Sequence, residues 1–139
     1  MPNKIANDKK TEKAMKKLGQ ILFECRKEKS LRKVAEPCGI SAPQLLSIEK
    51  GTLCPTAEVY AKLVEALEPN QKQQISMDRL FMVIRGTPPP DVCRIMINNE
   101  SLNNVLRQIG DAVLTIEQID EINNLINTFN LNQGEEKDG

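Results

Sequence analysis

Residues 39–51 have the sequence Gly39-Ile40-Ser41-Ala42-Pro43-Gln44-Leu45-Leu46-Ser47-Ile48-Glu49-Lys50-Gly51, and this stretch decides the fold of the first half of the chain. Gly39 supplies the permissive backbone of a tight turn. Ala35, four residues earlier, is small enough for a second short helix to pass close to it. Ile40, Leu45 and Ile48 bury the inner face of that second helix. The stretch therefore predicts two short helices that cross at a steep angle.

Start and stop signals mark the predicted helices clearly. Ser41 is a preferred N-cap residue and Gln44 stands three positions on, which is the arrangement of a capping box. Pro43 is tolerated in the first turn because its missing N–H would have had no helical partner. Gly51 ends the same helix, and Thr56 caps the next one.

Three further helices are predicted around this pair, each with apolar residues at spacings of three and four. The first helix of the chain spans about residues 11–27. Within the pair itself, the short helix before Gly39 spans about residues 31–38. After the pair, a fourth helix covers about 56–68 and a fifth covers about 71–85. The residues predicted to be buried in these helices are Met15, Leu18, Leu22, Cys25, Val59, Leu63, Val64, Leu67, Met77, Leu80, Phe81 and Ile84.

The composition favours a helical protein with an aliphatic core. Of the 139 residues, 40% are hydrophobic but only 3% are aromatic. This balance favours the packing of small aliphatic side chains between helices over a β-sandwich. The length suits one core, or one small domain with an oligomerisation segment. The predicted fold class is all-α.

The two parts of the chain differ in charge although the formal net charge is zero. Residues 1–50 carry 12 Lys and Arg against 6 Asp and Glu, whereas residues 51–139 carry 7 against 13. Clustered basic side chains suit a polyanion, whose phosphates release counterions on binding. The run of Lys9, Lys10, Lys13, Lys16 and Lys17 has a second interpretation, in which it only solubilises the N-terminus.

Several kinds of site are disfavoured. The chain has no His, and its four Cys include no Cys-x-x-Cys pair, so we expect no metal site. Cys25 and Cys38 occupy apolar helix positions typical of small core residues, with a thiol sensor as the alternative. No nucleophile with a base and no phosphate-binding glycine loop is found, so we expect no enzyme and no cofactor. With no signal peptide and no apolar run near ~20 residues, we expect a cytoplasmic chain without a membrane partner.

The chain after residue 86 is predicted to form a separate helical segment. Residues 87–90 contain three consecutive prolines and are the predicted linker, with the segment at 91–132. Residues 1–10 are a predicted disordered basic tail, and 133–139 a polar tail. Roughly 40 residues of helix cannot bury so many aliphatic side chains alone, so we expect them to pack on the first unit or on a second copy. The predicted dimerisation residues are Leu102, Val105, Leu106, Ile109, Ile119, Ile122, Ile126 and Phe129.

Residues 18–67 resemble the lambda-repressor-like Cro/XRE family of helix-turn-helix proteins. The positions that carry the resemblance are Leu22, Cys25, Arg26, Val34, Ala35, the run Gly39-Ile40-Ser41, Leu45, the run Ile48-Glu49-Lys50-Gly51, and Pro55. The resemblance implies a five-helix DNA-binding domain over residues 11–86, followed by the small helical dimerisation segment.

The resemblance also implies how DNA would be read. In that family the helix that begins here at Ser41 enters the major groove, so Ala42, Pro43, Gln44 and Ser47 would face base edges. Gln44 can pair with N6 and N7 of adenine, or fold back to cap Ser41, and both roles stay open. Ala42 and Pro43 offer only apolar contact, which leaves much of the specificity to DNA shape.

Phosphate contacts are assigned by the chemistry of the side chains. Arg32 and Lys33, Lys50 and Thr52 are of types that bind phosphate, with a solvated basic rim as the other interpretation. The resemblance gives Glu49 a structural role instead, as the partner of Arg26.

The function that these patterns favour is a sequence-specific regulator of transcription. We expect a repressor of a bacterium or phage, in the nucleoid, that binds double-stranded DNA as a homodimer on a palindromic operator. Two reading helices would then lie one turn, ~34 Å, apart. The alternative is an antitoxin or adaptor that grips a partner protein, such as a toxin, through its C-terminal helices, with DNA binding secondary.

Overall fold

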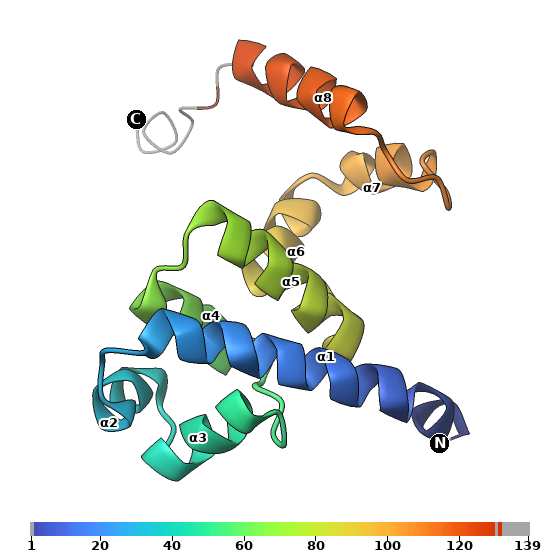
Figure 1. The fold of residues 1–139 in the computed structure, drawn as a ribbon. Helices are drawn as coiled ribbons and strands as arrows, with labels where there is room; N and C mark the ends of the chain where they lie inside the picture. The colour runs from blue at the N-terminus through green and yellow to red at the C-terminus, as the bar shows by residue number, and fades with distance from the viewer. Residues whose placement is uncertain (1, 130, 132–139) are drawn as a thin grey trace. The chain divides into compact units, whose positions relative to one another are not determined.

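The computed structural model describes residues 2–129 and 131, and the predicted tail at 133–139 lies outside them. The described residues form helices and loops without a strand, which confirms the all-α class (Figure 1). The elements are α1 (Pro2–Arg26), α2 (Leu31–Ala35), the 3-10 turn η1 (Glu36–Cys38), α3 (Ala42–Lys50), α4 (Ala57–Leu67), α5 (Gln71–Arg85), α6 (Pro90–Asn98), α7 (Glu100–Arg107) and α8 (Ile116–Thr128). None of the helices described is long and apolar enough to cross a bilayer.

The chain divides into two compact units, Met1–Asn99 and Glu100–Gly139. The proline run was predicted to separate the units, but the division falls after α6. Pro89 is the N-cap residue of α6, and Pro90 is its first residue. A proline suits this position because its fixed φ matches the helix and its missing N–H has no helical partner. Helix α6 then packs against α4, so the prolines start a helix of the first unit.

Helix α1 also differs from the prediction, because it begins at Pro2 where a disordered tail to residue 10 was expected. The stretch lacks apolar periodicity, which is why the sequence pattern placed the start near Thr11. It also contains no helix-breaking residue after Pro2, so the helix continues without interruption to Arg26.

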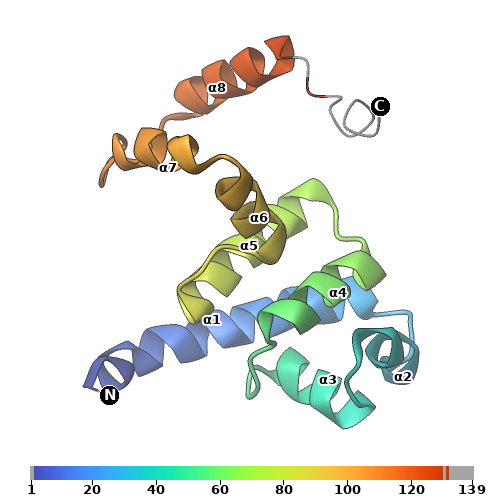
Figure 2. The same ribbon diagram turned by 180° about the vertical axis from the view of Figure 1, so that it is seen from behind.

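The core of the first unit is built around α1, which packs against α5, α3 and α4 (Figure 1 and Figure 2). Most predicted core positions are buried, including Leu18, Leu22 and Leu45. Tyr60 of α4, which was not predicted to be a core residue, is 1% exposed and stacks on Phe81 of α5, with ring centroids 4.4 Å apart. The buried set is Ala14, Leu18, Leu22, Val34, Ala35, Cys38, Leu45, Ile48, Tyr60, Leu63, Leu67, Met77, Leu80 and Phe81.

The ends predicted for α3, α4 and α5 are present in the structure. Ser41 caps α3 in a full capping box with Gln44, and Thr56 caps α4. Gly51 follows α3 with φ of 82°, and Gly86 follows α5 with φ of 76°. These left-handed conformations cost a residue with a Cβ roughly 1–2 kcal/mol.

The second unit contains α7 and α8. Thr115 starts α8 with a capping box closed by Gln118, as the sequence predicts. None of the described residues of this unit is buried. Its helices therefore keep their apolar faces exposed.

Gly51 and Gly86 allow a matched test of how closely the helices pack. A Cβ at Gly51 would lie 2.7 Å from the Cα of Lys16, whereas nothing lies within 4 Å of a Cβ at Gly86. We expect Gly86→Ala to lower the free energy of unfolding by about 1 kcal/mol, from backbone strain alone. Gly51→Ala should cost about 1–3 kcal/mol more, from overpacking against α1. Urea unfolding measures both, and equal losses would contradict the close approach of α1.

Candidate nucleic-acid interface

Helices α2 and α3 are joined by η1 and a short turn. Gly39 takes φ of 77°, and the N–H of Ile40 donates to the carbonyl of Ala35 at 3.2 Å. Ser30, which was not predicted as a cap, caps α2 by accepting from the N–H of Lys33 at 3.0 Å. The turn and the cap hold the two short helices in one arrangement, with Val34 and Ala35 of α2 buried against the core.

Helix α3 has a buried and an exposed face. Leu45 and Ile48 point into the core, with exposed fractions of 0% and 2%. Pro43 and Gln44 are exposed, while Ala42 and Ser47 are half-buried. The structure thus places the predicted base-facing residues on the first two turns, away from the core. Leu46, which no prediction named, is 38% exposed on the same helix.

Gln44 occupies its capping role in this structure. Its Oε1 accepts from the N–H of Ser41 at 2.8 Å, and its own N–H donates to the Ser41 hydroxyl at 3.1 Å. Bidentate pairing with adenine needs both the oxygen and the NH₂ group of the side chain. Gln44 would therefore have to leave the cap in order to read a base in this way.

The predicted phosphate-binding residues lie at helix ends. Arg32 and Lys33 are exposed in the first turn of α2, and Lys50 is exposed at the end of α3. Thr52 is exposed in the next loop, where its hydroxyl donates to the carbonyl of Ser47 at 3.2 Å. These side chains have the chemistry for phosphate contacts, and that role stays a prediction.

Arg85 of α5 holds the loop after α3 in place, a role that was not predicted from the sequence. Its Nε and Nη2 donate to the carbonyl of Pro55 at 3.1 and 2.8 Å, and Nη2 also donates to the carbonyl of Cys54 at 3.3 Å. Because 30 positions separate Arg85 from Pro55, no local pattern could have indicated the contact.

Arg26 and Glu49 form the ion pair that the resemblance implied. The Arg26 Nε lies 2.5 Å from Glu49 Oε2, and Nη2 donates to Oε1 at 3.0 Å. A third hydrogen bond joins Nη1 to the carbonyl of Lys29 at 2.7 Å. The two side chains are only 11% and 4% exposed, and the hydrogen bond to Glu49 raises the pKa of Arg26. The pair fastens the end of α1 to the end of α3.

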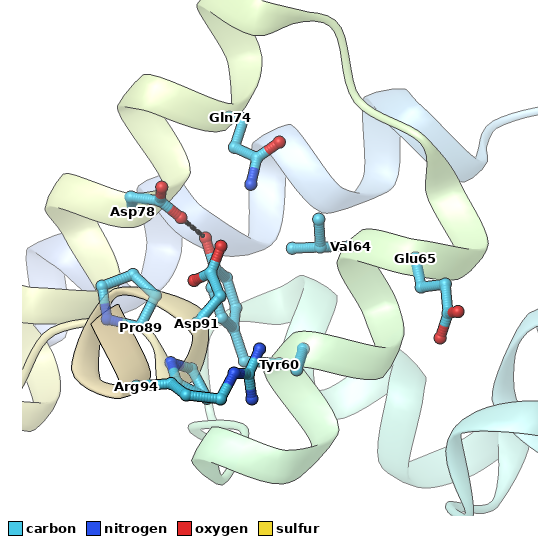
Figure 3. A pocket seen from close by; sticks show the side chains of 10 residues that line it. Tyr60, Val64, Glu65, Gln74, Asp78, Pro89, Asp91 and Arg94 are labelled. Atoms are coloured by element: carbon cyan, nitrogen blue, oxygen red, sulfur yellow. Dashed lines mark hydrogen bonds between the residues drawn. The ribbon is translucent and has the colours of Figure 1, made fainter. Parts of the chain in front are cut away.

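A pocket lined by both polar and apolar side chains lies on the first unit between α4, α5 and the start of α6. The Tyr60 hydroxyl donates to Asp78 Oδ1 at 2.6 Å, and Asp91 and Arg94 line the same pocket (Figure 3). Burial is the main cause of the raised pKa of Asp78; the Tyr60 hydrogen bond lowers it and the charge of Asp91 raises it further. Burial, followed by the bond to Asp78, likewise raises the pKa of Tyr60. The Tyr60–Asp78 hydrogen bond links α4 to α5 close to the start of α6.

The cysteines of the first unit are free thiols. Cys38 is buried in the core, as predicted, and Cys25 is half-buried. Burial raises the pKa of both thiols, which keeps them protonated and slows their reaction.

The predicted dimerisation residues lie along α7 and α8 or just beyond them. All are exposed except Ile109, which is half-buried, and Phe129 is the C-cap residue of α8. Exposed fractions reach 54% at Val105 and 43% at Ile119.

Comparison of the chain with protein-family models, with curated proteins and with solved structures finds no match.

Removing one partner of the Arg26–Glu49 pair should lower the free energy of unfolding much more than removing both partners. Glu49→Ala leaves the Arg26 charge without its partner in a largely dry site, and we expect a loss of about 3 kcal/mol or more. The double variant Arg26→Met/Glu49→Met should recover most of that loss, because no charge is left unpaired. Chemical unfolding of Arg26→Met, Glu49→Met and the double variant completes a double-mutant cycle. Additive losses would show that the pair contributes nothing.

The raised pKa of Asp78 predicts that the free energy of unfolding depends on pH. Because its pKa is raised in the folded state, that state binds more protons than the unfolded chain just above the ordinary aspartate pKa, about 4. Stability should therefore fall as the pH rises through that window, and Asp78→Asn, which keeps an acceptor for Tyr60, should remove this part of the fall.

Asp78→Ala is the matched control. It leaves the buried Tyr60 hydroxyl without an acceptor, so we expect a loss of about 1–3 kcal/mol at every pH. Melting temperatures measured from mildly acidic to neutral pH compare the three proteins. An Asn variant that loses as much as the Ala variant would contradict the assignment.

Proposed function

We propose that this protein is a sequence-specific, double-stranded DNA-binding regulator of transcription, a repressor that acts as a homodimer on a palindromic operator. In this proposal α1–α5 form a lambda-repressor-like domain, and α2 and α3 are its helix-turn-helix unit. One observation carries the proposal. Helix α3 is anchored by Leu45, Ile48 and the Arg26–Glu49 pair, while its first two turns face outward between basic side chains.

The exposed turns of α3 suit the major groove, which is wide enough to admit a helix. Ser47 and a released Gln44 would bond to base edges, and Ala42 and Pro43 would contact a thymine methyl. Phosphate contacts that set the position of α3 along the groove would come from Arg32, Lys33, Lys50 and Thr52. Few direct base contacts remain for one domain, so DNA shape and a second domain would supply the rest of the specificity.

Dimerisation is assigned to the second unit. Its helices carry exposed aliphatic stripes, and none of its described residues is buried, so a second copy of the unit would remove much apolar surface from water. Two-fold pairing would set two copies of α3 ~34 Å apart on the operator.

The same exposed stripes favour a second candidate function. Helix α8 carries Glu117, Asp120 and Glu121 and no basic residue, which suits a basic partner protein. An antitoxin or adaptor would use this surface on another chain, with DNA binding secondary. A partner of different mass that copurifies in equal amount with the native chain would favour this candidate.

Selection of bound duplexes from host genomic fragments tests the proposed function. We expect the full chain to bind one palindromic site at least about tenfold more tightly than random duplex. Gln44→Ala should relax the preference at one base pair, by about 1–3 kcal/mol. Gln44→Glu keeps a capping-box acceptor at the same position but cannot donate to adenine, so it should lose base preference and keep its stability. Binding of every duplex with equal affinity would refute the proposal.

The proposed homodimer is tested with the same full-length protein. Sedimentation of the full chain should give the mass of two copies, and Ile119→Asp with Ile126→Asp should give the mass of one. Operator affinity should fall in this double variant while the first unit keeps its unfolding transition. A monomeric native chain on a single half-site would remove the homodimer from the proposal.

A further inference from the structure

We propose that Lys9 and Lys16 of α1 form a second phosphate-binding surface, which lengthens the DNA contact beyond the end of α3. This inference rests on the proposed function. Helix α1 is continuous through this stretch, so its lysines hold fixed positions along one axis. Lys9 and Lys16 are seven residues apart and therefore share one face, about 10 Å apart along the axis.

Helix α1 meets the end of α3 at Lys16. The backbone of Lys16 lies directly against Gly51, the residue between the predicted phosphate contacts Lys50 and Thr52. Helix α1 runs past α3 at this point and continues beyond it (Figure 1 and Figure 2). The lysine face thus begins where the predicted phosphate contacts of α3 end.

The charges of Lys9 and Lys16 are available to a ligand. Lys9 and Lys16 are exposed, and Glu12 is the only acidic residue between Lys9 and Lys17. The ion pairs found among the described residues join Arg26 to Glu49 and Lys62 to Glu58, and neither uses a lysine of α1. Glu12 lies on the same face, three residues from Lys9 and four from Lys16, but it forms no ion pair with either lysine in the described part of the chain. A preformed helix also loses less conformational entropy on binding than a disordered tail does.

The same helix supplies a matched control. Lys10 and Lys17 have the same seven-residue spacing but lie toward α5, where they line a hollow with Arg79 and Leu80. The pairs therefore carry the same charge in the same turns and differ in the face that they occupy. A specific phosphate surface depends on the Lys9 and Lys16 pair, whereas a diffuse positive field depends equally on both.

The experiment measures the salt dependence of DNA binding by fluorescence anisotropy. The probes are the selected operator duplex and a random duplex of equal length, each with the full chain. Each phosphate contact contributes about 0.9 to the slope of log K against log salt. We expect Lys9→Gln/Lys16→Gln to reduce the slope by about 1–2 and the affinity by about tenfold at about 0.1 M salt. Both probes should respond equally, because phosphate contacts carry no sequence information.

Lys10→Gln/Lys17→Gln should reduce the slope by less than half as much, and thermal melts should show that both double variants fold. An unchanged slope, or equal reductions from the two pairs, overturns the surface while leaving the proposed function intact. A native chain that binds no duplex overturns both. Loss of preference for the operator in the Lys9 and Lys16 variant, without a change of slope, also overturns the surface.

Discussion

The close packing of α1 against α3 is the constraint on which the rest of the first unit depends. A Cβ at Gly19 would clash with the carbonyl oxygen of Glu49, so the two helices approach to backbone contact there. The Arg26–Glu49 pair closes the same junction, and Leu18, Leu22 and Ile48 are buried in the same core. Because α3 is fixed at its inner face and at its end, its outer face is held in one orientation.

The two halves of the chain expose different kinds of surface. The basic half places most of its exposed Lys and Arg on α1, α2 and α3, while its largely buried Arg26 is neutralised by Glu49. The acidic half leaves its aliphatic stripes on α7 and α8 exposed. Charge that favours a polyanion and apolar surface that favours a protein partner are thereby kept on separate parts of the chain, which is the arrangement that the proposed DNA-binding dimer requires.

Local signals allowed most of the helices to be predicted from the sequence. The capping boxes at Ser41 and Thr115 and the stop at Gly86 depend on hydrogen bonds and backbone conformations within a few residues. The Arg26–Glu49 pair spans 23 positions and was predicted only through the resemblance to a family. The start of α1 was missed because its first residues are polar, and the unit boundary was misplaced because prolines serve equally in linkers and at helix starts.

The sequence by itself determined the helical class, most of the helix ends and the separation of charge, because these depend on near neighbours and on composition. Only the tertiary structure decided which distant groups meet. The Tyr60 bond to Asp78, the Arg85 bonds to the loop at Pro55 and the contact of Lys16 with Gly51 all join segments far apart in the chain. Such contacts follow from how the helices pack against one another, and no local pattern of residues records that packing.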